Sequence, residues 1–281
     1  MNLFEKFIYA FQKTMQTPTI FGWFHILWLF IMIVACTLII IFRKKISQKG
    51  VKYTILTVGI LLILFEIMKQ LVYSFNWNEE TQTVTWSYQW YAFPFQFCST
   101  PMYLMLIAGL CKKNLFRDSL YAYLATFALF GGFIVMVYPG DVFTSTIFIS
   151  IHTMLWHSSM VVIGVLIWAT NSIEFKQKTF LKALCVFASM LAIAMLANFI
   201  WKWAGGIETG QTFNMFYISP YYSCHLALLS TIYANAPYIV FLLCYILGFS
   251  LAAYIVTMIA FAINYGYLKN KEKKDKKYPL K

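Results

Sequence analysis

The sequence contains few charged residues. Asp, Glu, Lys and Arg together make up 11% of its 281 residues, whereas hydrophobic residues make up 61%, and the mean hydropathy is +0.69. This composition lies far outside that of soluble domains. It excludes an ordinary soluble protein and predicts an integral membrane protein.

Arginine is nearly absent. Arg43 and Arg117 are the only arginines among 22 basic residues, and the formal net charge is +12. A nucleic-acid-binding protein would gather these cations on one face, but here they lie in short clusters between apolar runs. We therefore expect no nucleic-acid partner and interpret the clusters as signals of membrane orientation.

Metal-binding and secretory patterns are also missing. The six cysteines are scattered through mostly apolar runs without CxxC spacing, which argues against a zinc site or a disulfide framework. Residues 1–19 lack the charged start and compact apolar core of a signal peptide. We expect no metal, no cofactor and no cleaved leader.

Apolar runs long enough to cross a bilayer occur seven times, given that a transmembrane helix needs ~20 residues at ~1.5 Å each. The predicted spans are 20–42, 53–75, 89–111, 117–138, 145–169, 180–203 and 237–267. The sequence thus predicts an all-α fold. It is a polytopic helical bundle in a single membrane domain, residues 1–281, with a basic cytoplasmic tail over residues 268–281.

Basic residues follow every second predicted span. They lie in the connections 43–52, 112–117 and 176–182, whereas the alternate connections carry acidic residues and almost no cations. Because cytoplasmic loops are enriched in Lys and Arg, the N-terminus is predicted outside and the C-terminus inside the plasma membrane.

Two segments on the predicted outer side are more than connectors. Residues 76–91 are rich in Trp, Tyr and Thr, as expected of a segment at the membrane interface. Residues 205–237 are apolar enough to enter the membrane, but their glycines and prolines prevent a straight span. We expect a lid or partly re-entrant element there; an ordered outer loop with a short amphipathic helix is the alternative.

The stretch AFPFQFCSTPMY, starting at Ala92, predicts a site. It places the Cys98 thiol in the third span between Pro94 and Pro101, with the polar Gln96 beside it. A lone cysteine in lipid is often only a small hydrophobe. The prolines loosen a helix and the amide needs a partner in hydrocarbon, so together these residues favour a functional thiol.

Span five contains two histidines, His152 and His157. Five residues correspond to about 140° on a helix, so they do not share a face. Counted from the outer ends of their spans, His157 lies ~18 Å deep and Cys98 ~14 Å deep. A thiol is a poor nucleophile until a base takes its proton, and imidazole is the usual base, so Cys98 with His157 is the preferred pair.

Other polar residues have structural explanations as well as functional ones. Glu66 and Lys69 share a helix face and either neutralise each other or let Glu66 reach a ligand. Lys202 is placed to extend toward water, and His25 is expected to be an interfacial residue. Cys224 and His225 form a rival pair, for which an interfacial location is the simpler interpretation.

Several motifs resemble those of a known family, the YwaF-like membrane proteins of bacteria, which are related to the TMEM164-type acyltransferase of animals. The motifs are FPFQFC, WHSSMVVIG, NMFYISP and NAPY, in that order, and the similarity covers most of the chain. The resemblance implies an acyl group carried on Cys98 with His157 as its base. Gln96 stands where the bacterial family commonly has histidine.

The sequence leaves two functions open. The first is a lipid acyltransferase, or hydrolase, that passes an acyl group from a phospholipid through a Cys98 thioester to a lysolipid or another acceptor. Its substrate-binding or supporting residues are expected to be Gln96, Glu66, Asn198, Asn214 and Tyr217, with either asparagine as a candidate oxyanion donor. The alternative is a transporter or sensor that binds a small solute or lipid within the bundle.

Overall fold

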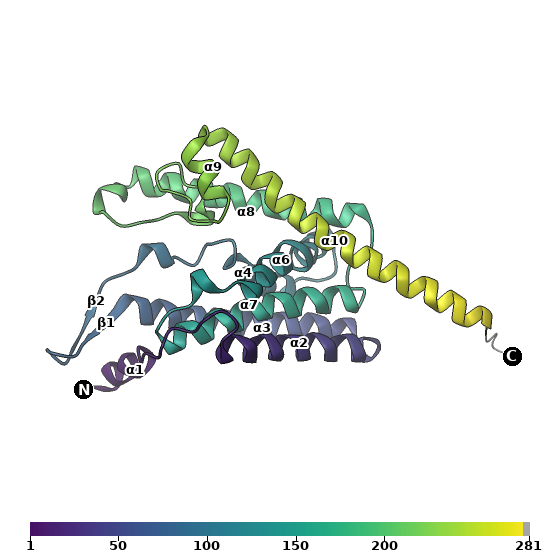
Figure 1. Ribbon diagram of the computed structural model, residues 1–281, viewed down its shortest axis with the longest axis horizontal. Coiled ribbons are helices and arrows are strands. Elements are labelled where there is room, and N and C mark those ends of the chain that lie inside the picture. Colours follow the sequence, from purple (N-terminus) through teal and green to yellow (C-terminus); the bar gives the residue numbers. More distant parts are fainter. Residues whose placement is uncertain (278–281) are drawn as a thin grey trace.

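Long helices run back and forth between two ends of the molecule in the computed structural model, which describes residues 1–277 (Figure 1). The helices and strands are α1 (Leu3–Phe11), α2 (Trp23–Phe42), α3 (Gln48–Ser74), β1 (Phe75–Asn78), β2 (Thr83–Trp86), α4 (Thr100–Leu110), α5 (Leu115–Tyr123), α6 (Leu129–Val137), α7 (Ile147–Ala169), α8 (Gln177–Trp203), α9 (Leu229–Asn235) and α10 (Tyr238–Lys277). Residues 278–281 of the predicted tail lie outside the described part.

Within residues 1–277, six helical segments are long and apolar enough to cross a membrane. They are Trp23–Lys45, Gln48–Ser74, Leu115–Val137, Ile147–Ala169, Gln177–Trp203 and Tyr238–Tyr267. A multi-pass helical membrane bundle agrees with these lengths and compositions. The predicted number of seven is not confirmed, because the third span is not one long helix.

The third predicted span, 89–111, contains only the 11-residue helix α4. Phe93 has ψ 133°, an extended conformation, as expected of a residue whose α-helical geometry is disfavoured by the proline that follows it. Pro101 lies in the first turn of α4, where its missing N–H costs nothing. The two prolines therefore end and restart the helix instead of only loosening it.

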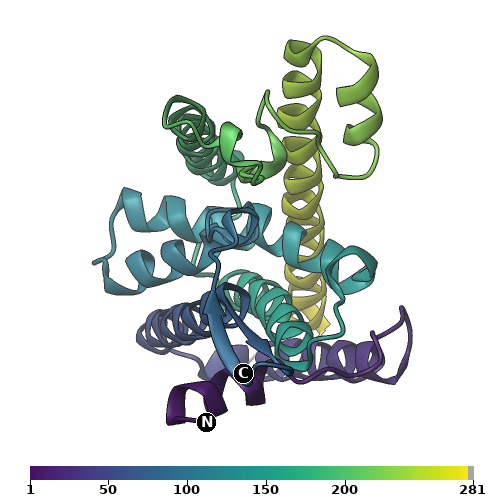
Figure 2. The ribbon, with the colours of Figure 1, turned by 90° about the vertical axis from the view of Figure 1, so that its left-hand side faces the viewer.

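The helices form three layers. In Figures 1 and 2, α2, α3 and α7 lie on one side, α8 on the other, and α4 with α5 and α6 between them, while α10 starts on the α8 side and runs obliquely across the layers. α5 and α6 are joined by a π-helical turn, Leu124–Ala128, whose five residues are all buried. The indole of Trp168 on α7 donates to the Ala125 carbonyl at 2.7 Å, which satisfies a carbonyl within this irregular turn.

α6 and α7 pack closely because α6 carries glycine at the contact. A Cβ at Gly132 would lie 2.6 Å from the His157 carbonyl oxygen. Small residues at such contacts let two helix backbones approach in a membrane. The backbone of α7 around His157 is therefore held directly against α6.

A two-stranded antiparallel hairpin, β1 and β2, departs from the all-α prediction. Its register pairs Phe75 with Trp86 and Asn78 with Thr83. Trp and Thr favour strands, so the composition that predicted an interfacial segment also explains the hairpin. The Gln12 side chain after α1 accepts from Trp77 N–H at 3.0 Å and fastens the hairpin to the N-terminal segment.

The basic connections lie together at the end opposite the hairpin. Lys52 reaches the Leu110 carbonyl at 3.4 Å, and Gln48 reaches the Thr170 carbonyl at 2.9 Å. The Arg43 guanidinium lies 4.9 Å from the ring centre of Tyr267. This gathering agrees with the charge pattern in the sequence; which end faces the cytoplasm stays a prediction.

Candidate functional site

Cys98 lies in a turn directly before α4, and not inside a helix. The backbone groups of this turn are hydrogen-bonded: Ser99 N–H donates to the Gln96 carbonyl at 2.8 Å, and the Thr100 hydroxyl donates to the Phe97 carbonyl at 3.0 Å. The indole of Trp156 on α7 donates to the Cys98 carbonyl at 2.7 Å. Irregular backbone inside a membrane bundle requires such partners.

Cys98 is a free cysteine and is half-buried. It packs against the main hydrophobic core, in which Tyr123 and Tyr245 are buried and against which Tyr217 also packs. These tyrosines come from α5, from α10 and from the segment after α8. Elements far apart in the sequence therefore meet in the core against which Cys98 packs.

His157 is buried next to Trp156, the residue that contacts Cys98. Its Nδ1 lies 2.7 Å from the Thr153 carbonyl oxygen. Because a carbonyl can only accept, Nδ1 carries the ring proton and Nε2 is the basic nitrogen. Within residues 1–277 no hydrogen bond joins His157 to Cys98, and their pairing stays a prediction.

His152 belongs to a buried group of polar side chains that we call the ionic cluster: Glu66, Lys69, Gln70 and His152. Lys69 Nζ lies 2.8 Å from Glu66 Oε1, which confirms that these two residues pair. Gln70 donates to Glu66 at 2.7 Å, and His152 Nε2 lies 3.6 Å from Glu66 Oε2.

The ionic cluster reaches the Cys98 turn by two routes. The His152 ring stacks on Trp156 with 4.9 Å between centroids, and Trp156 holds the Cys98 carbonyl. Gln70 also donates to the Ala92 carbonyl at 2.7 Å. His152, which faces away from His157 by helical spacing, is therefore not an isolated residue.

Three side-chain amides, Gln96, Asn198 and Asn214, form what we call the carboxamide clasp. Gln96 donates to the Asn214 carbonyl at 2.9 Å and accepts from Phe216 N–H at 2.8 Å. Asn198 donates to the Met215 carbonyl at 3.1 Å and accepts from Met215 N–H at 2.8 Å. Asn214 accepts from Ser219 N–H at 2.9 Å.

The carboxamide clasp holds residues 205–237, the predicted lid, over the Cys98 turn. Gln96 is thus part of an intact polar network. The amides of Asn198 and Asn214 are occupied by backbone groups, and their role as oxyanion donors stays a prediction. Whether the lid enters the membrane also stays a prediction.

The backbone held by the carboxamide clasp is strained. Phe216 and Tyr217 have φ of 58° and 57°, in the left-handed region that bulky residues rarely occupy. Such geometry persists only where the surroundings enforce it, and it is common at functional sites. Burial raises the pKa of the Tyr217 phenol above its ordinary value.

The remaining candidates have clear locations. His25 is fully buried: its Nδ1 accepts from Phe21 N–H at 2.9 Å and its Nε2 donates to the Met136 carbonyl at 2.8 Å. Its location at the membrane interface stays a prediction. Cys224 is buried whereas His225 is exposed, and no hydrogen bond joins them within residues 1–277. Lys202 lies over the Tyr221 ring at 5.5 Å.

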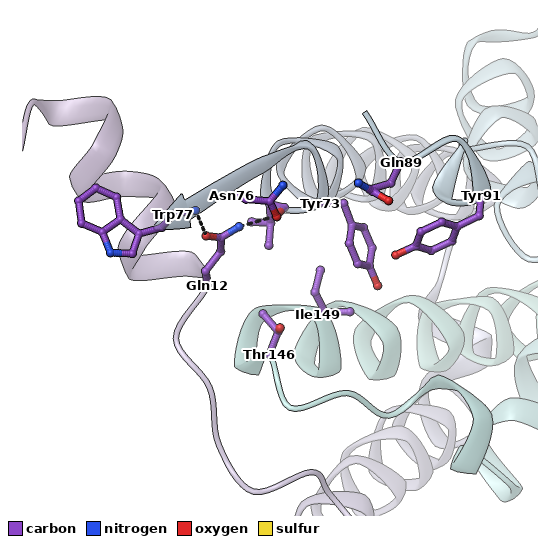
Figure 3. A pocket seen from close by; sticks show the side chains of 9 residues that line it. Gln12, Tyr73, Asn76, Trp77, Gln89, Tyr91, Thr146 and Ile149 are labelled. Carbon is purple, nitrogen blue, oxygen red and sulfur yellow. Dashed lines mark hydrogen bonds between the residues drawn. The ribbon is translucent and has the colours of Figure 1, made fainter. Parts of the chain in front are cut away.

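Two cavities open at the hairpin end of the bundle. The lid cavity, of about 510 Å³, lies between residues 87–96 and 210–225, and Gln96 and Tyr217 line it. The hairpin cavity, of about 410 Å³, lies between β1, the end of α3 and the start of α7 (Figure 3). Gln89 and Tyr91 line both cavities.

Metal chemistry finds no support in the part of the chain that the structure describes. There, no group of three or more His, Cys, Asp or Glu side chains is placed to hold a metal ion.

Sequence reasoning missed two contributors to the site, Trp156 and the full ionic cluster. Trp156 stands in the quoted WHSSM motif, beside His157, and indoles that are buried usually find an acceptor. His152 and Trp156 are four residues apart and so lie on one helix face. The position of Trp156 in the motif and its spacing from His152 were the signals available in the sequence. Neither signal identifies the partner on another helix.

No curated protein and no solved structure matches the chain. A sequence model of the TMEM164 family matches residues 20–249. This match runs from the start of α2 into α10 and contains Cys98, His157, the ionic cluster and the carboxamide clasp. Since it covers well over half of the sequence, the chain belongs to the TMEM164 family.

Proposed function

We propose that this membrane protein is a lipid acyltransferase, or the corresponding hydrolase, and that Cys98 carries the acyl group as a thioester. The observation that supports it best is the hydrogen bond from Trp156 to the Cys98 carbonyl, since it brings the Cys98 turn to the part of α7 that carries His157, one residue further along the helix. Irregular backbone beside a free thiol is also costly inside a membrane bundle, and such polar features often mark functional sites.

The proposed reaction has two halves. His157 Nε2 takes the thiol proton, Cys98 Sγ attacks the ester carbonyl carbon of a phospholipid, and the bond from that carbon to the glycerol oxygen breaks as the proton passes to this oxygen. In the second half, an acceptor hydroxyl gives its proton to His157 and attacks the thioester carbon, and the thiol leaves with the proton. Water as the acceptor makes the same cycle a hydrolysis.

Mass spectrometry of the intact purified protein tests this proposal. After incubation with phospholipid, the Cys98 peptide should carry a fatty acyl mass increment that hydroxylamine removes. Cys98→Ala should abolish the adduct, and His157→Ala should suppress it because the thiol then lacks its base. Cys224→Ala is the matched control, since it removes the other buried cysteine near the lid and should leave the adduct in place.

His152→Ala, which helical spacing alone favours as a silent control, is unsuitable because His152 contacts Glu66 and stacks on Trp156. Full lipid turnover in both Cys98→Ala and His157→Ala would refute the acyl-enzyme proposal.

The ionic cluster favours a second function, binding of a proton or small solute by a transporter or sensor. Glu66 Oε2 and His152 Nε2 are buried and accept or donate no hydrogen bond within residues 1–277. Ionisable groups at membrane depth often mark such pathways. Solute-dependent stabilisation that persists in Cys98→Ala but is lost in Glu66→Gln would favour this alternative. For either function, we place the protein in the plasma membrane of a bacterium, following the resemblance to bacterial proteins.

A further inference from the structure

The lid cavity and the hairpin cavity are polar but uncharged. The chain has 22 basic and 10 acidic residues, yet none of them lines either cavity. The lid cavity is lined mainly by amides and hydroxyls, among them Gln89, Gln96, Gln211 and Tyr217, together with the exposed imidazole of His225. The basic connections lie at the opposite end of the bundle, so a ligand bound here would meet uncharged hydrogen-bonding groups.

Charged lipid headgroups fit this lining poorly. A phosphate is usually held by Arg, Lys or a helix N-terminus, and a primary ammonium by a carboxylate. Amides and hydroxyls instead offer both a donor and an acceptor, which matches the hydroxyl groups of a sugar or of glycerol. Tyrosine rings add flat apolar faces with a polar tip, and such faces pack against the C–H side of a sugar ring.

The two cavities are neighbours. Gln89 and Tyr91 line both of them, and Figure 3 shows Tyr73 and Tyr91 directed toward each other in the hairpin cavity with Gln89 beside them. Each volume, about 510 and about 410 Å³, lies within the range of small-molecule sites, roughly 300–1,000 Å³.

The lid cavity lies close to the Cys98 turn. Gln96, two residues before Cys98, lines the cavity, as does Tyr217, and both Tyr217 and Cys98 pack against the main hydrophobic core. A headgroup bound there would hold its own hydroxyl or ester groups near the sulfur. From this geometry we infer that the lid cavity binds an uncharged polyhydroxyl headgroup, that of a glycosyl-diacylglycerol, whose ester would take the place of the phospholipid ester in the reaction at Cys98; the exchange itself rests on the proposed function.

Binding to the full-length Cys98→Ala protein tests this inference without requiring the reaction. Native mass spectrometry from a polyoxyethylene detergent, which contains no sugar, would be titrated with monoglucosyl-diacylglycerol, phosphatidylethanolamine and phosphatidylglycerol of identical acyl chains. The glycolipid should bind at least tenfold more tightly than either phospholipid. Equal or weaker binding of the glycolipid would overturn the inference.

Gln211 provides the test variants because it lines the lid cavity and its side chain forms no hydrogen bond within residues 1–277. Gln211→Ala should weaken glycolipid binding by about fivefold, the usual effect of one lost hydrogen bond. Gln211→Lys should lower the preference for the glycolipid and raise binding of phosphatidylglycerol. Gln177→Ala, at the opposite end of the bundle on α8, is the matched control and should change neither.

Two further measurements, glucose binding and thioester formation, distinguish the remaining explanations. Glucose alone, if it bound as tightly as the glycolipid, would support the hydroxyl chemistry but overturn the lipid as its source. A protein that binds the glycolipid and forms no thioester would leave this inference standing and refute the proposed function. A protein that forms the thioester but shows no preference for the glycolipid would support the proposed function and overturn this inference.

Discussion

The ionic cluster and the carboxamide clasp use different chemistry to stabilise the same turn. The ionic cluster joins α3 and α7 through a buried carboxylate, with Lys69 2.8 Å from Glu66. The carboxamide clasp uses no charge, and its amides bind the backbone of the lid, as in the paired hydrogen bonds between Asn198 and Met215. One joins regular helices, whereas the other stabilises irregular backbone.

This difference follows from what each region must satisfy. A buried charge requires a counter-charge, because desolvation is costly and a lone ion cannot be compensated by packing. An irregular backbone requires alternating donors and acceptors, and a primary amide supplies one of each on a short side chain. Substitutions in the ionic cluster are therefore expected to lower the stability of the whole protein, whereas substitutions in the carboxamide clasp are expected to release the lid.

The largest effect is expected from breaking the ionic cluster. Glu66→Ala should lower the free energy of unfolding by about 3–5 kcal/mol, because the Lys69 ammonium is left buried without its partner. Lys69→Ala should act similarly, and the double variant should lose less than the two single losses combined. Unfolding in detergent micelles would measure this cycle.

Glu174→Ala is the matched control for the ionic cluster, since Glu174 pairs with Lys176 at 3.2 Å on the exposed surface. It should leave the unfolding transition unchanged. Strictly additive losses from Glu66→Ala and Lys69→Ala would contradict the coupling that the geometry implies.

A smaller and more local effect is expected from the carboxamide clasp. Asn198→Ala removes both hydrogen bonds to Met215 and should cost about 2 kcal/mol, since buried backbone groups are left unsatisfied. Hydrogen exchange should rise in the lid, around residues 213–219, and stay unchanged in α3 and α7. Asn235→Ala, at an exposed asparagine of α9, is the control. Equal exchange across the whole bundle would remove the distinction between the two regions.

The sequence predicts the ionic cluster better than the carboxamide clasp. Glu66 and Lys69 are three residues apart, so helical geometry alone brings them together. The partner of Asn198 lies 17 residues away in irregular backbone, and no periodicity predicts such a contact. His152 illustrates the same limit: its helix was predicted, but its contact with Glu66 depends on how α3 and α7 pack.

Proline chemistry explains the main difference between the predicted helices and those of the structure. Hydropathy over residues 89–111 is that of a span, but Pro94 and Pro101 break the helix, and the Cys98 turn results. The estimate of depth for Cys98 from helical rise was therefore invalid, although the Trp156 contact does place this residue beside the middle of α7. The hydropathy of a segment cannot distinguish a membrane-spanning helix from a turn whose carbonyls are hydrogen-bonded by side chains of other helices. The backbone hydrogen bonds of the structure do distinguish them.

The smallest effect is expected where the lid meets the end of α8. Lys202 Nζ lies 5.5 Å from the centre of the Tyr221 ring, and both side chains are partly exposed, so the contact is screened by solvent. Lys202→Met keeps most of the side-chain volume and should cost only about 0.5 kcal/mol, the usual size of an exposed cation–π contact.

Tyr221→Phe retains the ring and should therefore leave this small contribution intact, whereas Tyr221→Leu should remove it, with no further loss when Lys202→Met is added. Thermal unfolding of these variants in one detergent would measure the series. A loss from Lys202→Met as large as that from Asn198→Ala would mean that charge also holds the lid. The contrast between helices joined by charge and a lid held by uncharged amides would then not hold at the junction of the lid and α8.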